Sequence, residues 1–268
     1  MDLITVGVVT YNSSDTVIET LEGIYNQTYQ ELELVVSDDG SKDSTVEIVK
    51  KWIEEHKSRF KAVHLLIAHR NAGVSQNCNR VLKIAKGKYL AIIAGDDIFY
   101  PHAIATKYEY ALQHSSKIVF SKVDCFGTCG EERMKIQRYC NRGYYYAKRP
   151  YREQWEAMIE KNFITGPSGS FYNREYLLGI HGFDTRYPML EDYPLLFRYM
   201  KNGNEIRMID EALVRYRVSG KSLCTSGNKK FNRSGLKFLI RERVAELIKA
   251  GKYKICIDLL LRKIKAAL

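Results

Sequence analysis

The sequence predicts an α/β protein with a mostly parallel sheet flanked by helices and followed by a basic helical tail. In the first hundred residues, short apolar runs alternate with segments of helical periodicity, as in crossover units. Polar clusters follow three of those runs, at the end of the strands where ligands bind in such sheets. The segment from Lys221 to Leu268 holds 13 Lys and Arg against three acids, so it carries +10 of the net charge of +11.

Four apolar runs are expected to form the strands of the first half, at residues 4–9, 32–36, 63–68 and 89–94. Continuous apolar runs of this length are typical of parallel strands that are buried on both faces. Helices are expected over about 14–27, from 44 onward, and over 74–86. Ser44 to Glu47 matches a capping box, which predicts where the second of these helices begins.

After residue 100 the pattern is weaker. Ile118 to Phe120 is expected to be a strand, 138–155 an aromatic and basic loop, and 166–172 a tight turn that leads into a strand. A helix is expected to begin at Glu191-Asp192, because acids suit a helix N-terminus. The tail from 235 to 268 is expected to form two helices broken near Gly251.

Composition narrows the class of protein. Apolar residues make up 45% of the 268, which is enough for a packed core. No run of 18 uncharged apolar residues occurs and the N-terminus lacks a basic region with a long apolar run, so we expect neither a membrane span nor a signal peptide. The six cysteines are scattered without zinc spacing, which favours reduced thiols in the cytoplasm.

Two acidic pairs follow predicted strands, Asp38-Asp39 and Asp96-Asp97. Each pair alone fits an ordinary turn in which Asp caps the next element. Two acidic strand ends on one sheet repel each other unless a cation or a donor-rich ligand lies between them. The two pairs together therefore predict a Mg²⁺ or Mn²⁺ site that also receives diphosphate oxygens.

Five motifs occur in order: VGVVTYNS (6–13), VVSDDGSKDST (35–45), Asn71-x-Gly73 with Asn79, YLAIIAGDD (89–97) and LEDYPLLFR (190–198). With these motifs the chain, from about residue 3 to 220, resembles the inverting glycosyltransferases of the GT-A fold, the large family 2. The resemblance implies a nucleotide-sugar-binding half at 1–100 and an acceptor-binding half at 101–220, with the basic helical tail at 221–268.

The resemblance also implies a role for each matching residue. Thr10 and Tyr11 would contact the nucleotide base, Asn71 the nucleotide-sugar, and Asp39 the uracil imide, which favours a UDP-sugar donor. The two acids after the fourth strand would serve the ribose and the metal (Asp96) and coordinate the metal (Asp97). Asp192 would be the catalytic base, although Glu191-Asp192 alone also fits the charge of a helix N-terminus.

The sequence departs from the family at three positions. Ala94 replaces an acid that many relatives have before the Asp pair, and Ser219 stands near the place of a His, so a third protein ligand to the metal is in doubt. Cys78 replaces an arginine, and Arg70 or Arg80 is the alternative contact for the diphosphate. Residues 144–146, three tyrosines among basic residues, fit either sugar or lipid-diphosphate binding or an ordinary surface loop.

The implied reaction is a single displacement at the anomeric carbon by a hexosyl- or N-acetylhexosaminyl-transferase. It needs a base for the acceptor hydroxyl and charge relief for the leaving UDP, for which the resemblance offers Asp192 and a cation on Asp97. The basic tail predicts docking to an anionic membrane face, which suits a lipid-linked oligosaccharide acceptor in surface polysaccharide synthesis. We therefore expect a cytoplasmic enzyme, peripheral on the inner face of the cell membrane.

Two other classes of protein share some of these features. A nucleotidyltransferase also places carboxylates at strand ends, but it needs a Gly-rich basic loop after the first strand, and residues 10–14 have neither feature. A non-enzymatic protein with a nucleic-acid-binding tail needs interleaved basic and aromatic residues. The tail has few aromatics and a long apolar seam, so we expect lipid or self-packing there and no nucleic acid.

Overall fold

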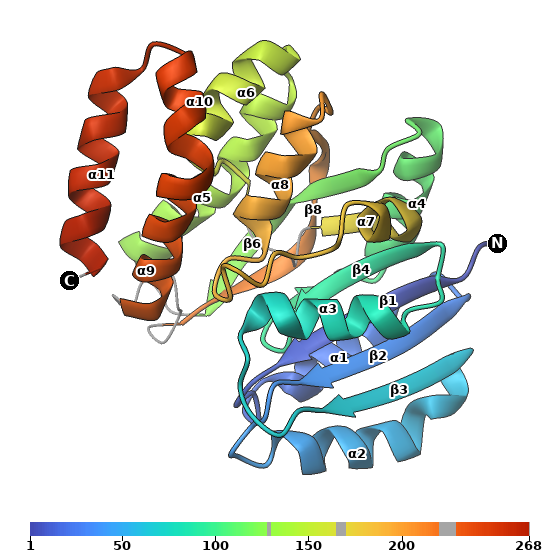
Figure 1. The fold of residues 1–268 in the computed structure, drawn as a ribbon. Helices are drawn as coiled ribbons and strands as arrows, with labels where there is room; N and C mark the ends of the chain where they lie inside the picture. The colour runs from blue at the N-terminus through green and yellow to red at the C-terminus, as the bar shows by residue number, and fades with distance from the viewer. Residues whose placement is uncertain (128–129, 165–169, 220–228, 268) are drawn as a thin grey trace.

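The structure is a computed structural model that describes residues 1–127, 130–164, 170–219 and 229–267. Within these residues one eight-stranded sheet has the order β3-β2-β1-β4-β7-β6-β8-β5 (Figure 1). Its strands are β1 (Ile4–Thr10), β2 (Leu32–Asp38), β3 (Ala62–Ile67), β4 (Tyr89–Ala94), β5 (Ile98–Phe99), β6 (Ile118–Gly127), β7 (Ser170–Asn173) and β8 (Arg207–Val218).

The sheet is mostly parallel, as predicted. β1 lies between β2 and β4 and is parallel to both, so that Val8 pairs with Val36 on one side and with Ile93 on the other. β3 is parallel to β2, and β6 to β8. β7 runs antiparallel to both β4 and β6, and β5 antiparallel to β8. The carboxyl ends of β1, β2 and β4 therefore meet at one edge of the sheet.

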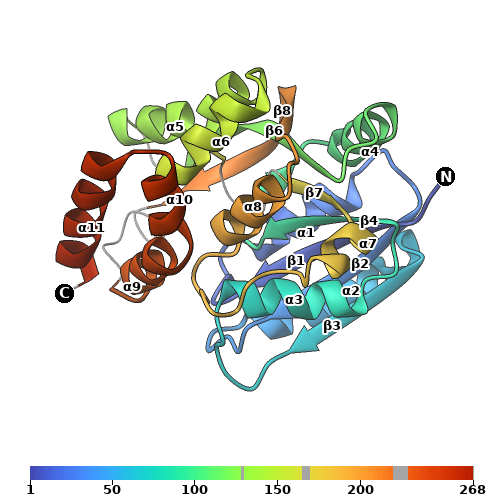
Figure 2. The same ribbon diagram turned by 45° about the horizontal axis from the view of Figure 1, so that its top comes forward.

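Helices cover both faces of the sheet, because successive residues of each buried strand point to opposite sides. Ala91 and Ile93 of β4 join the core under α1 (Val17–Tyr25), α2 (Thr45–His56) and α4 (Ala103–Gln113). Leu90 and Ile92 join the core under α3 (Val74–Ile84), α6 (Tyr151–Glu160) and α8 (Asp192–Lys201) (Figure 2). The short α7 (Arg174–Gly179) follows β7, and the 3-10 turn η1 (Lys57–Arg59) follows α2.

The tail packs against the α8 side of the molecule. It comprises α9 (Lys229–Phe238), a π-helical turn η3 (Leu239–Arg243), α10 (Val244–Lys249) and α11 (Tyr253–Ala267). The ring of Phe238 meets the rings of Tyr187, Tyr193 and Phe197 at centroid distances of 5.2, 4.9 and 5.6 Å. The predicted break near Gly251 is confirmed, since that residue has a φ of +70° between α10 and α11.

The predicted loop at 138–155 is wrong, because residues 138–147 belong to α5 (Glu131–Ala147) and residues 151–155 to α6. Their basic and aromatic residues pair at helical i,i+4 spacing, with Lys148 4.1 Å from the ring centre of Tyr144 and Arg149 4.5 Å from that of Tyr145. This pairing covers an exposed helix face, so a pattern that looked irregular as a loop is regular as a helix.

α2 begins where the capping box predicted, but the side chain of Ser44 makes no capping hydrogen bond. The carboxylate of Asp43 instead accepts the Thr45 N–H at 3.1 Å and the Thr45 hydroxyl at 2.5 Å. The predicted turn at 166–169 lies outside the described residues. In the part of the chain that is described, no helix combines the length and apolar content that a membrane crossing requires.

Candidate active site

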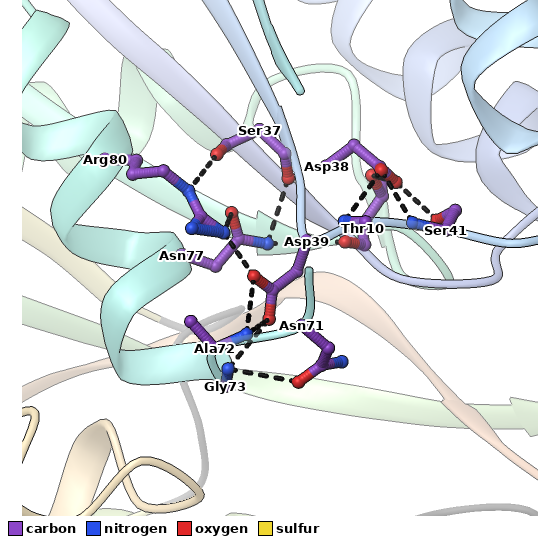
Figure 3. Close-up of polar contacts among 11 residues, drawn as sticks. Thr10, Ser37, Asp38, Asp39, Ser41, Asn71, Ala72, Gly73, Asn77 and Arg80 are labelled. Carbon is purple, nitrogen blue, oxygen red and sulfur yellow. Dashed lines mark hydrogen bonds and ion pairs between the residues drawn. The ribbon is translucent and has the colours of Figure 1, made fainter. Parts of the chain in front are cut away.

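The carboxyl end of β2 is tied to β1 by Asp38, which pairs with Thr10 in the parallel register. The Asp38 carboxylate accepts hydrogen bonds from the Thr10 hydroxyl at 3.0 Å, from the Gly40 N–H at 3.0 Å and from the Ser41 N–H at 2.8 Å, with the Ser41 hydroxyl as a further donor (Figure 3). Asp38 is therefore a structural acid that closes the loop after β2.

Asp39 connects β2 to the loop after β3. It is only 2% exposed, and its carboxylate accepts the N–H groups of Ala72 at 3.1 Å and Gly73 at 2.8 Å and forms an ion pair with Arg80 (Figure 3). A buried carboxylate is costly unless donors surround it, and here three do. Asn71 lies in the same loop, exposed, with its side-chain oxygen 3.1 Å from the Gly73 nitrogen.

Asp96 and Asp97 lie in different surroundings in the turn after β4. Asp97 is 1% exposed, and its Oδ1 accepts the N–H of Arg217 from β8 at 2.8 Å. Asp96 is less buried, its backbone carbonyl accepts Nε of Arg217 at 2.8 Å, and burial raises the pKa of its carboxyl. The N–H of Gly95 donates to the Val9 carbonyl at 3.0 Å, so this turn lies beside the end of β1.

Arg217 of β8 holds the acidic turn after β4 in place, and the sequence assigned it no role. Besides its two contacts to the acidic turn, its guanidinium forms an ion pair with Glu19 of α1 at 2.9 Å and lies over the ring of Phe126. It therefore fixes the acidic turn to β8 and α1. The signal in the sequence was its place two residues before Ser219, which stands near the position where the resemblance puts a His.

The other predicted acids stand at the start of α8. The carboxylate of Asp192 accepts the side-chain N–H of Asn162 at 2.8 Å and the N–H of Tyr193 at 2.6 Å. Burial and the neighbouring charge of Asp192 raise the pKa of Glu191 to about 8. Asn162 holds Asp192 from a different segment, and no pattern in the sequence pointed to it.

The segment that precedes α8 lies against the Asp39 loop. The Ser75 hydroxyl donates to the Tyr187 carbonyl at 2.9 Å. Gly73 has a φ of +95°, and a Cβ atom there would lie 2.4 Å from the Pro188 carbonyl oxygen, so only glycine fits. Cys78 of α3 is buried, and burial together with the charges of Glu191 and Asp39 raises the pKa of its thiol. The structure thus brings the β2 acid and the start of α8 to the same part of α3.

Three other residues are candidates for contacts to the nucleotide-sugar. Tyr11 is exposed just after β1, where it is accessible to a ligand. Arg80 contacts Asp39, the Ser37 hydroxyl and Asn77, so it supports the acid and is less suited to contact a diphosphate. Arg70 is exposed in the loop beside Asp39 and remains the better candidate for that contact.

The donor set is small for a metal. Over the described ranges, no cluster of three or more His, Cys, Asp or Glu side chains is arranged to hold an ion. Mg²⁺ at nucleotide sites is usually bound through one or two carboxylates while phosphate oxygens and water complete its shell. The carboxylate of Asp96, the less buried of the two acids, follows the strand beside the end of β1 and fits that mode of binding.

Comparison with known proteins identifies the family. The sequence model of "Glycosyl transferase family 2" matches residues 5–179, which is more than half of the chain. The chain belongs to this family. Among its family 2 relatives are an uncharacterized glycosyltransferase, YibD, of Escherichia coli K12 (34% identity over 128 residues) and the E. coli enzyme WfaP (31% over 121 residues). WfaP is named UDP-Glc:alpha-D-GlcNAc-diphosphoundecaprenol beta-1,3-glucosyltransferase.

The alignments cover 47% and 45% of this chain, but only 36% of YibD and 45% of WfaP, so the matched region spans less than half of either relative. Solved structures agree on the GT-A fold. S. aureus TarS 1-349 in complex with UDP-GlcNAc matches 97% of this chain and 72% of its own, with a TM-score of 0.69 and 20% identity. The mannosyltransferase PcManGT of Pyrobaculum calidifontis, in complex with GDP-Man and Mn²⁺, matches 99% and 74%, with a TM-score of 0.66 and 18% identity.

Proposed function

We propose that this family 2 chain is an inverting glycosyltransferase. In this proposal it moves a hexosyl or N-acetylhexosaminyl group from a UDP-sugar to a saccharide linked to polyprenyl diphosphate, in surface polysaccharide synthesis. The observation that carries the proposal is that Asp39 and Asp96 follow the carboxyl ends of strands of one parallel sheet, while the segment leading to Glu191 and Asp192 packs against the start of α3 beside Asp39. The name of WfaP and the ligands of TarS support the donor and acceptor classes.

On the donor side, Asp39 would accept the imide N–H of uracil, because a carboxylate oxygen makes a strong charge-assisted bond to such a donor. Thr10 and Tyr11 would contact the base at the end of β1, and Asn71 the nucleotide-sugar. Mn²⁺ or Mg²⁺, when bound, would offset the negative charge that develops on the departing diphosphate.

Either acid of the turn after β4 is a candidate for holding that cation. The resemblance assigns the metal to Asp97, and that assignment stays a prediction. Asp97 is buried, with a carboxylate oxygen already accepting the Arg217 N–H. Asp96 is more accessible, so its geometry favours it as the carboxylate that reaches the ion.

On the acceptor side, Asp192 would accept the proton of the acceptor hydroxyl while that oxygen bonds to the anomeric carbon and the bond to the UDP oxygen breaks. Asn162 and the Tyr193 N–H orient the Asp192 carboxylate. Attack from the face opposite to the leaving group inverts the configuration at the anomeric carbon.

The test is a transfer assay of the full chain. Purified protein is incubated with a panel of UDP- and GDP-sugars and with GlcNAc-diphosphoundecaprenol, in Mn²⁺ and in excess chelator. We expect product from a UDP-sugar, with the anomeric configuration inverted by NMR and with activity lost in chelator. Retention of configuration, or full activity in chelator, would contradict the mechanism, and exclusive use of GDP-sugars would contradict the donor.

A further inference from the structure

One face of α11 carries apolar side chains that the fold leaves in solvent. Tyr253, Ile257, Leu261 and Ile264 are 60%, 59%, 64% and 42% exposed. We call these four residues the α11 strip. At 100° per residue they fall within about 80° of the helix circumference, and they extend over roughly 16 Å of its length. Other helices of the described chain expose fewer large apolar residues, with Ile18 and Tyr25 on α1 and Met134, Tyr139 and Tyr145 on α5.

The α11 strip is not the face by which the helix packs. That face is formed by Cys256 and Ala267, which are buried, and by Leu259 and Leu260, which are half-buried against the core of α9 and α10. Ile264 lies outside that packing face and is 42% exposed. In Figures 1 and 2, α11 is the outermost helix on its side of the molecule. The helix therefore has a second apolar face for which folding gives no reason.

The charges beside the strip are positive. Lys254 and Lys265 are exposed and lie along one margin of the strip on the helical projection. Farther around the helix, Arg262 is paired with Asp258, the single acid of α11. This combination of an apolar strip with a cationic margin is the pattern of helices that lie in the plane of a membrane interface.

We propose that the α11 strip is a membrane-docking surface whose occupant is an anionic lipid bilayer. The four apolar side chains would enter the boundary between headgroups and acyl chains, and Lys254 and Lys265 would contact the lipid phosphates. The excess charge of the tail complements such a surface, whereas residues 1–220 are nearly neutral. The strip lies outside the candidate active site, so this inference is independent of the proposed reaction.

A second copy of the chain is a poorer occupant. If two strips packed around a twofold axis, the Lys254 and Lys265 margins of both copies would gather at the same interface. Like charges brought together in this way oppose association, and no acid of α11 is left to balance them, since Asp258 is already paired with Arg262.

The test is binding of the full chain to sedimenting vesicles of phosphatidylcholine with and without 30% phosphatidylglycerol. We expect binding to the anionic vesicles that weakens with salt. The double variant Ile257→Ser, Leu261→Ser should bind on the order of 100-fold more weakly, because the loss of each apolar side chain lowers the partition constant into the membrane about tenfold. Lys254→Gln, Lys265→Gln should lose roughly 30-fold, and only on anionic vesicles.

The matched control is Leu112→Ser, Leu178→Ser, which removes two exposed leucines of α4 and α7 and should bind like the wild type. UDP binding and melting temperature should be unchanged in all three variants. The proposal is overturned if the wild type does not bind anionic vesicles or if the strip variant binds as tightly as the wild type. It is also overturned if sedimentation shows a dimer that the strip variant dissociates while vesicles capture neither protein.

Discussion

The acids at the end of β2 and the acids at the start of α8 differ in how their negative charge is compensated. Asp38 and Asp39 each receive at least three donors, so their charges are compensated within the fold. At α8, the Asp192 carboxylate accepts hydrogen bonds from Asn162 and from the Tyr193 N–H, while burial and the neighbouring charge of Asp192 raise the pKa of Glu191. In the proposed function, the β2 acids would keep a fixed shape for the nucleotide, and the α8 acids, one of them with a raised pKa, would exchange the proton, as perturbed carboxyl groups often do.

Replacing Asp192 tests the proposed catalytic role of the α8 acids and should have the largest effect. Asp192→Asn preserves the shape and the Asn162 contact but removes the base, so kcat of transfer should fall by about 10²- to 10⁴-fold. UDP affinity, measured by calorimetry, should stay within twofold of the wild type, since Asp39 is untouched. Near-normal turnover in the variant would exclude Asp192 as the base.

Asp39→Asn tests the proposed nucleotide-binding role of the β2 acids. The amide cannot satisfy Arg80 and the two loop N–H groups as the carboxylate does, so the free energy of unfolding should fall by about 1.5–3 kcal/mol. UDP should bind at least tenfold more weakly by calorimetry. The control is Asp184→Asn, which removes an acid paired with exposed Arg186 outside the loop. If Asp39→Asn binds UDP normally, the donor assignment is wrong.

Glu191→Gln tests whether the α8 acids are under strain from burial and like charge. The folded-state pKa of about 8 lies above the ordinary value near 4.5, so the folded protein keeps a proton that the unfolded chain has lost. The wild type should therefore lose stability as the pH rises from about 4.5 to about 8. In Glu191→Gln that slope should flatten, while the exposed Glu175→Gln should keep it. Urea unfolding at pH 5, 6.5 and 8 measures this, and parallel curves for all three proteins would refute the assignment.

The first half of the fold was predictable because its information is local. Each of the four strands there is a continuous apolar run, and the parallel register then brings their carboxyl ends together. β8 was not predicted, because its burial alternates irregularly and it pairs with β6 through register shifts. α5 was mistaken for a loop, since its exposed face is aromatic and basic and its apolar stripe is thin.

In the candidate site, sequence motifs located the acids but not their partners. Asp39 and Asp192 were found from adjacent residues, whereas Arg217 and Asn162 come from segments 120 and 30 residues away from the acids they hold. Nor could the sequence separate Asp96 from Asp97, because the difference between them is burial against β8. Which face of α11 is exposed was equally a property of packing, not of periodicity.

Replacing Asp43 should have the smallest effect. Asp43 is a further acid near the end of β2 whose charge is compensated by hydrogen bonds, so it can be compared directly with Glu191. Burial alone would raise the pKa of Asp43, but hydrogen bonds from Thr45 and Ser14 outweigh it and lower that pKa to about 2. Its stabilisation is therefore complete above the ordinary pKa near 4 and is lost as the pH falls toward 2, the opposite of the trend expected for Glu191. Asp43→Ala should cost about 0.5–1 kcal/mol at pH 7, a low value for a capping residue because the carboxylate is partly exposed. In urea unfolding the gap between wild type and variant should close between pH 4 and pH 2, and a gap that stays constant over that range would show that the carboxylate is not held as the structure places it.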